Sequence, residues 1–276
     1  MGRAAAHALD VRQFQEGISY GMTVKSLCLP KDLATRYKNP AQKARVLTEA
    51  WAVQRLYCPR CGGRLKALPA NTRSRDFECT DCEESFQLKS KKGKFTASIT
   101  GAEYRTTIEN ILADRHPSLI LLEYTYDYYV ETVEVIHRAC ITPSCIKPRR
   151  PLSNAARRAG WQGCIIRVDA IPSIGRIIVV RDGSWRPRDQ VLRDWERAER
   201  FLRVRSVHRG WLAEVARILD ELPEEFTLEE VYAFEGELAE KYPENRHIRA
   251  KIRQQLQKLR DLGVIEFQGR GRYRKR

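Results

Sequence analysis

The chain has 276 residues, with 50 Lys and Arg against 35 Asp and Glu, a formal net charge of +15 and a pI of about 9.6. This excess favours a polyanionic partner, above all nucleic acid. An anionic membrane surface is the weaker alternative, because no long basic amphipathic helix with an aromatic-rich face is present. No segment has the roughly 20 apolar residues of a membrane span, and the N-terminus lacks the apolar core of a secretory signal.

The first part of the chain contains one clear helix. Residues 1–30 have no periodic pattern and are expected to form an N-terminal extension. Residues 40–57 place Leu47, Ala50 and Trp51 near the 3.6-residue spacing of a helix. This helix leads directly into a segment with two Cys-x2-Cys pairs.

A central sheet is expected from the middle of the chain. Its first two strand candidates are rich in β-branched and aromatic residues and flank a turn at Asp127. Two further candidates follow a loop rich in proline and arginine. In chain order, the predicted elements are a helix over 101–115, strands over 118–126, 128–138, 163–172 and 175–183, and a connecting helix within 183–205.

The C-terminal residues 205–276 follow the element order of a winged helix. An amphipathic helix is predicted over 211–222, and a capping box at Thr227–Glu230 opens a second helix that runs to about Lys241. A third helix ends at Gly263, and a basic β-hairpin completes the chain. Three helices followed by a two-stranded wing predict a DNA-binding domain.

Four cysteines have the spacing of a zinc site. Cys58-x2-Cys61 and Cys79-x2-Cys82 are separated by 17 residues. Two such pairs at this distance are typical of a tetrahedral four-thiolate site, which leaves no position open for catalysis. Reduced, unligated core cysteines are the less favoured alternative. We therefore expect a structural Zn2+.

The segment around the second cysteine pair also carries a candidate catalytic set. Asp76 precedes the pair, and Gln87 and Lys89 follow it in a strand pattern that places both on one face. A carboxylate and an amide oxygen can hold Mg2+ beside a phosphate, and a lysine can assist an attacking water. The pattern is that of metal-dependent nucleases, although a solvated basic turn would look similar.

Two basic segments are candidate DNA contacts. In the third helix of the C-terminal domain, Ile248, Ile252, Leu256 and Leu259 should pack inward, which leaves a polar face whose Arg and Gln side chains can recognise base edges. The second segment is the loop after residue 146. The candidates are Arg249, Arg253, Gln254 and Gln255 in the helix and Arg157, Arg158 and Trp161 in the loop. The alternatives are a solvated helix face and a tryptophan that fills the core.

The chain resembles the methyl-directed type II restriction endonucleases of the DpnI family. The resemblance is carried by QKARVLTEAW, YCPRCG, DFECTDCEESFQLKSKKGKF, ITPSCI, ARRAGWQGC, PSIGRIIVVRDG, FTLEEVYAFE and HIRAKIRQQLQKLRDLGVIEFQGRGRYRKR. It implies an α/β PD-(D/E)xK nuclease domain with a four-cysteine zinc site over 31–204 and a winged helix over 205–276. The expected protein is a cytoplasmic enzyme of a prokaryotic cell, monomeric or transiently paired on DNA. Its expected substrate is double-stranded DNA with N6-methyladenine in GATC-type sites.

The resemblance also assigns roles to individual residues. Asp76 looks like the Mg2+-binding acid and Lys89 like the catalytic lysine, with Glu49 as an auxiliary acid. Trp161 matches an aromatic residue near the methylated bases. We further expect Arg270 and Arg272 in the wing to hold the DNA.

One position departs from the family pattern. Gln87 stands where the family has a glutamate, so the site loses one negative charge and should bind Mg2+ less tightly. An active enzyme, a slower enzyme and a protein that binds without cutting all remain open. The alternative to an endonuclease is a non-cleaving methyl-DNA-binding protein or a zinc-ribbon/winged-helix transcription factor.

Overall fold

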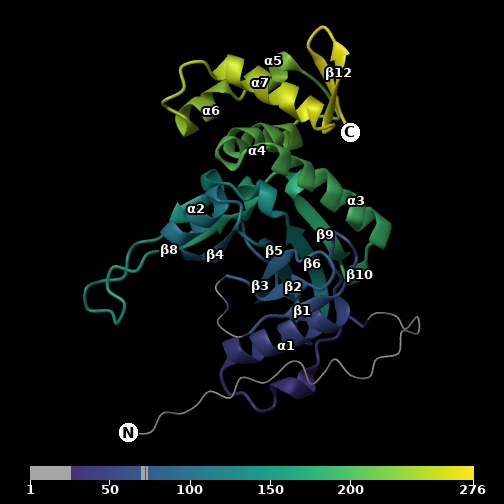
Figure 1. The fold of residues 1–276 in the computed structure, drawn as a ribbon, viewed down its shortest axis with the longest axis vertical. Helices are drawn as coiled ribbons and strands as arrows, with labels where there is room; N and C mark the ends of the chain where they lie inside the picture. The colour runs from purple at the N-terminus through teal and green to yellow at the C-terminus, as the bar shows by residue number, and fades with distance from the viewer. Residues whose placement is uncertain (1–25, 70–71, 73) are drawn as a thin grey trace. The chain divides into compact units, whose positions relative to one another are not determined.

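The protein, described here by a computed structural model over residues 26–69, 72 and 74–276, folds into two compact units (Figure 1). Each unit is assembled from several stretches of chain. Unit 1 comprises the residues up to Lys94, Pro117–Val135 and Ile178–Arg188. Unit 2 comprises Phe95–His116, Ile136–Ile177 and Asp189–Arg276. Most of the predicted N-terminal extension lies outside the described residues.

A seven-stranded sheet forms the centre of unit 1. The strand order is β1-β2-β3-β5-β6-β9-β10. β3 and β5 are parallel, whereas β1–β2, β2–β3 and β9–β10 are antiparallel. The strands are β1 (Leu65–Ala67), β2 (Phe77–Cys79), β3 (Ser85–Lys92), β5 (Ser118–Tyr124), β6 (Val130–Ile136), β9 (Arg176–Arg181) and β10 (Ser184–Trp185). The sheet confirms the strands predicted on either side of Asp127 and over 175–183.

The helix predicted over 40–57 is α1 (Pro40–Arg55), which covers part of this sheet (Figure 1). Asn39 caps it, because its side chain accepts the N–H of Ala41 at 2.9 Å, and Pro40 occupies the first turn. The buried face of the helix includes Trp51, and Thr48 Oγ1 lies 3.2 Å from Ser90 Oγ of β3. This contact fixes α1 beside the strand that carries the candidate catalytic lysine.

Unit 2 contains a separate three-stranded sheet, and this corrects one prediction. The strand predicted over 163–172 as part of the central sheet is β8 (Gly163–Arg167), which pairs with β4 (Ser98–Glu103) and β7 (Ile146–Pro148) instead. A short apolar strand does not specify its partner, because pairing depends on distant segments. Helix α2 (Tyr104–Leu112) is shorter than predicted, since Glu103 ends β4 and caps the helix.

The C-terminal part of unit 2 has the predicted winged-helix order. The helix predicted from Thr227 to Lys241 is divided in two, although its capping box is present. A third strand, β11, joins the wing, and the sheet order is β11-β13-β12. The elements are α4 (Ser206–Glu221), β11 (Glu225–Thr227), α5 (Leu228–Tyr232), α6 (Glu235–Lys241), α7 (Ile248–Asp261), β12 (Ile265–Gly269) and β13 (Arg272–Lys275).

Helix α4 is held to the rest of unit 2 at both ends. The buried Arg209 bonds Asp114, two residues after the end of α2. At the other end, Asp220 Oδ2 accepts the N–H of Ser173 at 2.7 Å. The winged helix and the β4-β8-β7 sheet therefore belong to one compact unit.

Shorter elements complete the chain. The predicted connecting helix is α3 (Arg188–Glu199). The 3-10 helices are η2 (Lys31–Ala34), η3 (Arg138–Cys140), η4 (Pro143–Cys145), η5 (Val168–Ala170), η6 (Ser173–Gly175) and η7 (Arg200–Arg203). Among the described residues, we find no helix with the length and apolar character needed to cross a membrane.

Candidate active site and nucleic-acid interface

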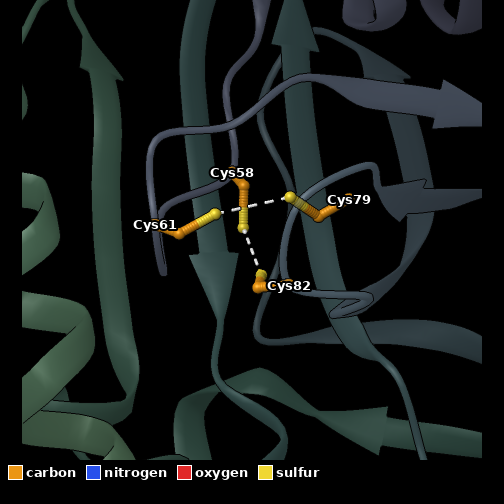
Figure 2. Close-up of side chains that lie close together, drawn as sticks. All are labelled: Cys58, Cys61, Cys79 and Cys82. Atoms are coloured by element: carbon orange, nitrogen blue, oxygen red, sulfur yellow. Dashed lines mark hydrogen bonds between the residues drawn. The ribbon is translucent and has the colours of Figure 1, made fainter.

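The side chains of Cys58, Cys61, Cys79 and Cys82 converge in unit 1 (Figure 2). All four sulfur atoms lie within 4.8 Å of one another. The Cys58 and Cys82 sulfurs are 3.6 Å apart, and those of Cys61 and Cys79 are 3.4 Å apart. The cluster can therefore hold a metal ion, as the spacing predicted, and four sulfur ligands fit Zn2+ in a closed tetrahedral site.

The two cysteine turns share one backbone conformation. The N–H of Gly62 donates to the Cys58 carbonyl at 2.7 Å, and the N–H of Glu83 donates to the Cys79 carbonyl at 3.2 Å. Gly62 and Glu83 occupy equivalent positions and both are left-handed, with φ of 79° and 58°. This conformation is easy for glycine but unfavourable for glutamate. The metal cluster therefore includes a locally strained turn at Glu83.

Without a metal, two of the four thiols, those of Cys58 and Cys82, would hold protons. Burial raises the pKa of Cys58 and raises the pKa of Cys82 to about 11. These thiols are then protonated at neutral pH. A bound Zn2+ replaces the protons, so metal binding and deprotonation are coupled.

Asp76, the residue before β2, is held against β3. Phe77 lies opposite Phe86 and Glu78 opposite Ser85 in the antiparallel pair of β2 and β3. The N–H of Asp76 donates to the Phe86 carbonyl at 2.8 Å, and Asp76 Oδ2 accepts the N–H of Leu88 at 2.8 Å. The Asp76 carboxylate is therefore held at the backbone of β3, at the residue between Gln87 and Lys89.

Gln87 and Lys89 share one face of β3 because side chains alternate along a strand. Phe86 and Ser90 have the opposite parity: the first is fully buried, and the second contacts α1. Gln87 and Lys89 are both partly exposed. The structure thus brings the Asp76 carboxylate to the segment of β3 that carries Gln87 and Lys89. Carboxylate and amide oxygens are donors that fit Mg2+.

Glu49 lies on α1, the helix that contacts β3 at Ser90. Its carboxylate is ion-paired with Arg45, with 2.7 Å between Oε1 and Nε, and its side chain is 21% exposed. Burial raises the pKa of Glu49, Arg45 opposes this rise, and the nearby charge of Asp76 adds to it. The predicted auxiliary acid is therefore within electrostatic reach of Asp76 but is held by an arginine.

The cysteine turns are connected to the sheet through a buried acid. Glu84, directly after the second turn, lies 3.9 Å from Arg60 of the first turn and accepts the hydroxyl of Ser118 on β5 at 3.4 Å. These contacts join both turns to the strand next to β3. The cysteine cluster therefore supports the pair of β2 and β3 next to Asp76 and Gln87.

The basic loop between β7 and β8 extends from the β4-β8-β7 sheet of unit 2 (Figure 1). Backbone bonds organise it, including the N–H of Leu152 to the Trp161 carbonyl at 2.9 Å. Arg157 and Arg158 are exposed, and the Arg158 guanidinium lies 5.0 Å from the centre of the Trp161 ring. Trp161 is partly exposed, so it remains available to a ligand instead of filling the core.

Helix α7 presents the predicted polar face. Ile248, Ile252, Leu256 and Leu259 are buried, which confirms the predicted inward side. The candidates with exposed side chains are Arg249, Arg253 and Gln254 in α7, and Arg270 and Arg272 in the wing. Arg249 is ion-paired with Glu235 at 2.7 Å, so it must exchange this partner to contact DNA.

Gln255 corrects the prediction for this face. Its side chain is fully buried and its Nε2 donates to Gln254 Oε1 at 3.2 Å. Position 255 is three residues after Ile252 and four before Leu259, which places it on the buried side of the helix. The predicted exposed position of Gln255 is wrong.

Models of known protein families match most of the chain. Residues 25–205 match DpnI, the Dam-replacing family, and residues 207–275 match the Dam-replacing HTH domain. The chain belongs to the Dam-replacing family. Membership indicates a restriction nuclease, and the C-terminal domain of this Dam-replacing protein indicates DNA binding.

The structure adds residues that sequence patterns did not single out. Arg45, which holds Glu49, and Glu84, which connects the cysteine turns to β5, had no motif of their own. A positive charge four residues before Glu49 was the one available signal for Arg45. Glu84 had no such signal, because its partners Arg60 and Ser118 are distant from it in the sequence.

The wing tip offers a test in which stability and binding change in opposite directions. Arg270 is left-handed, with φ of 47°, a conformation that asparagine tolerates better. We expect Arg270→Asn to raise the free energy of unfolding by up to about 1 kcal/mol. It should lower the salt dependence of DNA binding by about one phosphate contact. Thermal unfolding and binding across a salt series check both; unchanged binding would exclude Arg270 from the interface.

Proposed function

We propose that the protein is a methyl-directed type II restriction endonuclease. It would hydrolyse phosphodiester bonds in duplex DNA at GATC-type sites with N6-methyladenine, using Mg2+. The observation that carries the proposal is the Asp76 carboxylate bonded to the N–H of Leu88, the residue of β3 between Gln87 and Lys89, next to the four-cysteine cluster. Family membership supports the same conclusion.

Each residue of the site has a separate task. Asp76 and Gln87 would hold Mg2+, which polarises the phosphate and stabilises its developing charge. The N–H of Leu88 holds Asp76 Oδ2, so the carboxylate keeps one orientation toward β3. Lys89 would orient the attacking water and offset negative charge in the transition state. The cysteine cluster, with Zn2+, would support the strands without touching DNA.

Recognition would use the elements of unit 2. Trp161, Arg157 and Arg158 would contact DNA through the β7–β8 loop, and Arg253 and Gln254 of α7 would recognise base edges. Burial of one methyl group is worth roughly 1 kcal/mol. Strong preference for methylated DNA therefore needs contacts to two methyl groups, or two recognition elements that each test the methylation state. We propose the domain limits 31–204 for the nuclease and 205–276 for the winged helix.

A cleavage assay tests this function. Purified protein with Mg2+ or Mn2+ is expected to cut adenine-methylated plasmid and leave unmethylated plasmid intact. Gln87→Glu should lower the Mg2+ concentration needed for half-maximal cleavage, because it restores a negative ligand. Gel electrophoresis across a Mg2+ series measures both effects.

Two results would reject parts of the proposal. Methylated plasmid that stays intact with either metal would favour a non-cleaving methyl-DNA-binding protein. Equal cutting of both plasmids would remove the methyl specificity while keeping the nuclease.

A further inference from the structure

The Arg45–Glu49 ion pair lies in the turn of α1 that faces the candidate catalytic strand. The two residues are four apart, and the Nε–Oε1 distance is 2.7 Å. Thr48, between them, is fully buried and lies 3.2 Å from Ser90, the residue after Lys89. The helix turn that carries the pair is therefore held at a fixed place beside β3.

The two partners differ in exposure. The Arg45 side chain is 54% exposed, whereas that of Glu49 is 21% exposed. The carboxylate is thus fixed and partly desolvated, while the guanidinium can move into solvent or toward a ligand. Asp76 acts electrostatically on both groups. The arginine is the mobile member of a three-charge group.

The charges of this group set what a cation would meet. Asp76 and Glu49 carry two negative charges, and Arg45 cancels one of them while it stays paired. Gln87 adds no charge where a carboxylate would add another. In the paired state, a divalent cation therefore meets the net charge of a single carboxylate, and this favours weak binding.

We propose that Arg45 is a positioning residue that neutralises Glu49 until DNA binds. A backbone phosphate carries its negative charge at the DNA surface and offers a guanidinium two acceptor oxygens, so it can compete with the single Nε–Oε1 contact to Glu49. A DNA phosphate would draw Arg45 out of its ion pair with Glu49. The negative charge of Glu49 beside Asp76 would then no longer be offset, and metal binding would strengthen. The inference rests on the proposed nuclease function, and it makes metal and DNA binding mutually dependent.

The chain contains a matched pair for comparison. Arg105 and Glu109 in α2 have the same i,i+4 spacing, with 3.0 Å between the same atoms, and are 85% and 58% exposed. Arg105→Gln removes an equivalent ion pair of unit 2, whereas Asp76, Gln87 and Lys89 belong to unit 1. Arg45→Lys keeps the positive charge and serves as the conservative variant.

The test measures Mn2+ binding to zinc-loaded, full-length protein without DNA, by electron paramagnetic resonance of free Mn2+. Asp76→Ala defines binding outside the site. We expect Arg45→Gln to bind Mn2+ about fivefold more tightly than wild type, the effect of removing one charge within about 8 Å of a divalent ion in a water-like dielectric. Arg45→Lys and Arg105→Gln should match wild type, and Arg45→Gln/Glu49→Gln should lose the gain.

A second arm adds a short adenine-methylated duplex in the Lys89→Ala background, so that the DNA is not cut. The duplex should tighten Mn2+ binding more in the Lys89→Ala protein, which retains Arg45, than in the Arg45→Gln/Lys89→Ala protein.

Three results would overturn the inference: unchanged Mn2+ affinity in a folded Arg45→Gln protein, an equal gain in Arg45→Lys, or a gain that persists without Glu49. Failure of cleavage alone would reject the nuclease proposal and leave this coupling intact, because the first arm needs no DNA.

Discussion

Cys79→Ser is expected to destabilise unit 1 severely. Cys79 ends β2, three residues after Asp76, and its sulfur lies 3.4 Å from that of Cys61. A structural zinc site supplies about 10 kcal/mol of binding free energy at neutral pH, so weakening it should cost about 4 kcal/mol or more of unfolding free energy. For a chain of this size, the melting temperature should fall by roughly 10 °C. Zinc content and thermal unfolding measure the effect.

Cys28→Ser is the matched control. Cys28 is an exposed cysteine of the same unit outside the cluster. It should retain one zinc per chain and the wild-type melting temperature. If Cys79→Ser also kept its zinc and stability, the four sulfurs would not form a metal site that supports the fold.

The sequence predicted the cysteine cluster because ligand spacing is a local property. Cys-x2-Cys turns have a fixed backbone, and two of them in one segment leave few arrangements. The winged helix was predictable for a similar reason, since its capping box and apolar spacing lie within short windows. Gln255 shows the limit: a polar residue in a helix was assigned to the exposed side, although its position relative to Ile252 and Leu259 is buried.

Pairing between distant strands was less predictable. The apolar segment at 163–167 could have joined any sheet, and it pairs with β4, about 60 residues earlier in the chain. The neighbourhood of Asp76 and Gln87 depends on the register of β2 and β3, which the short cysteine segment limits to few choices. The Arg45–Glu49 pair lies near the candidate site only because α1 packs on β3, and no sequence pattern specifies this packing.

Asp76→Ala and Lys89→Ala are expected to abolish cleavage while retaining binding to methylated DNA. Loss of the metal-binding carboxylate removes several kcal/mol of transition-state stabilisation, so the cleavage rate should fall by at least about 10³-fold. Loss of the lysine removes a charge from the transition state and should cost about 10²–10³-fold. Single-turnover cleavage and gel-shift binding on the same duplex separate the two effects.

The control for this pair is Lys91→Ala. Lys91 has the same parity on β3 as Gln87 and Lys89 but is exposed and lies farther from Asp76. A general loss of positive charge would slow all lysine variants through weaker DNA binding. A catalytic role for Lys89 instead requires that Lys91→Ala cut at close to the wild-type rate once the DNA is saturated. Equal losses in the two lysine variants would reduce Lys89 to a phosphate contact, and would leave metal binding by Asp76 and Gln87 as the chemical task of this site.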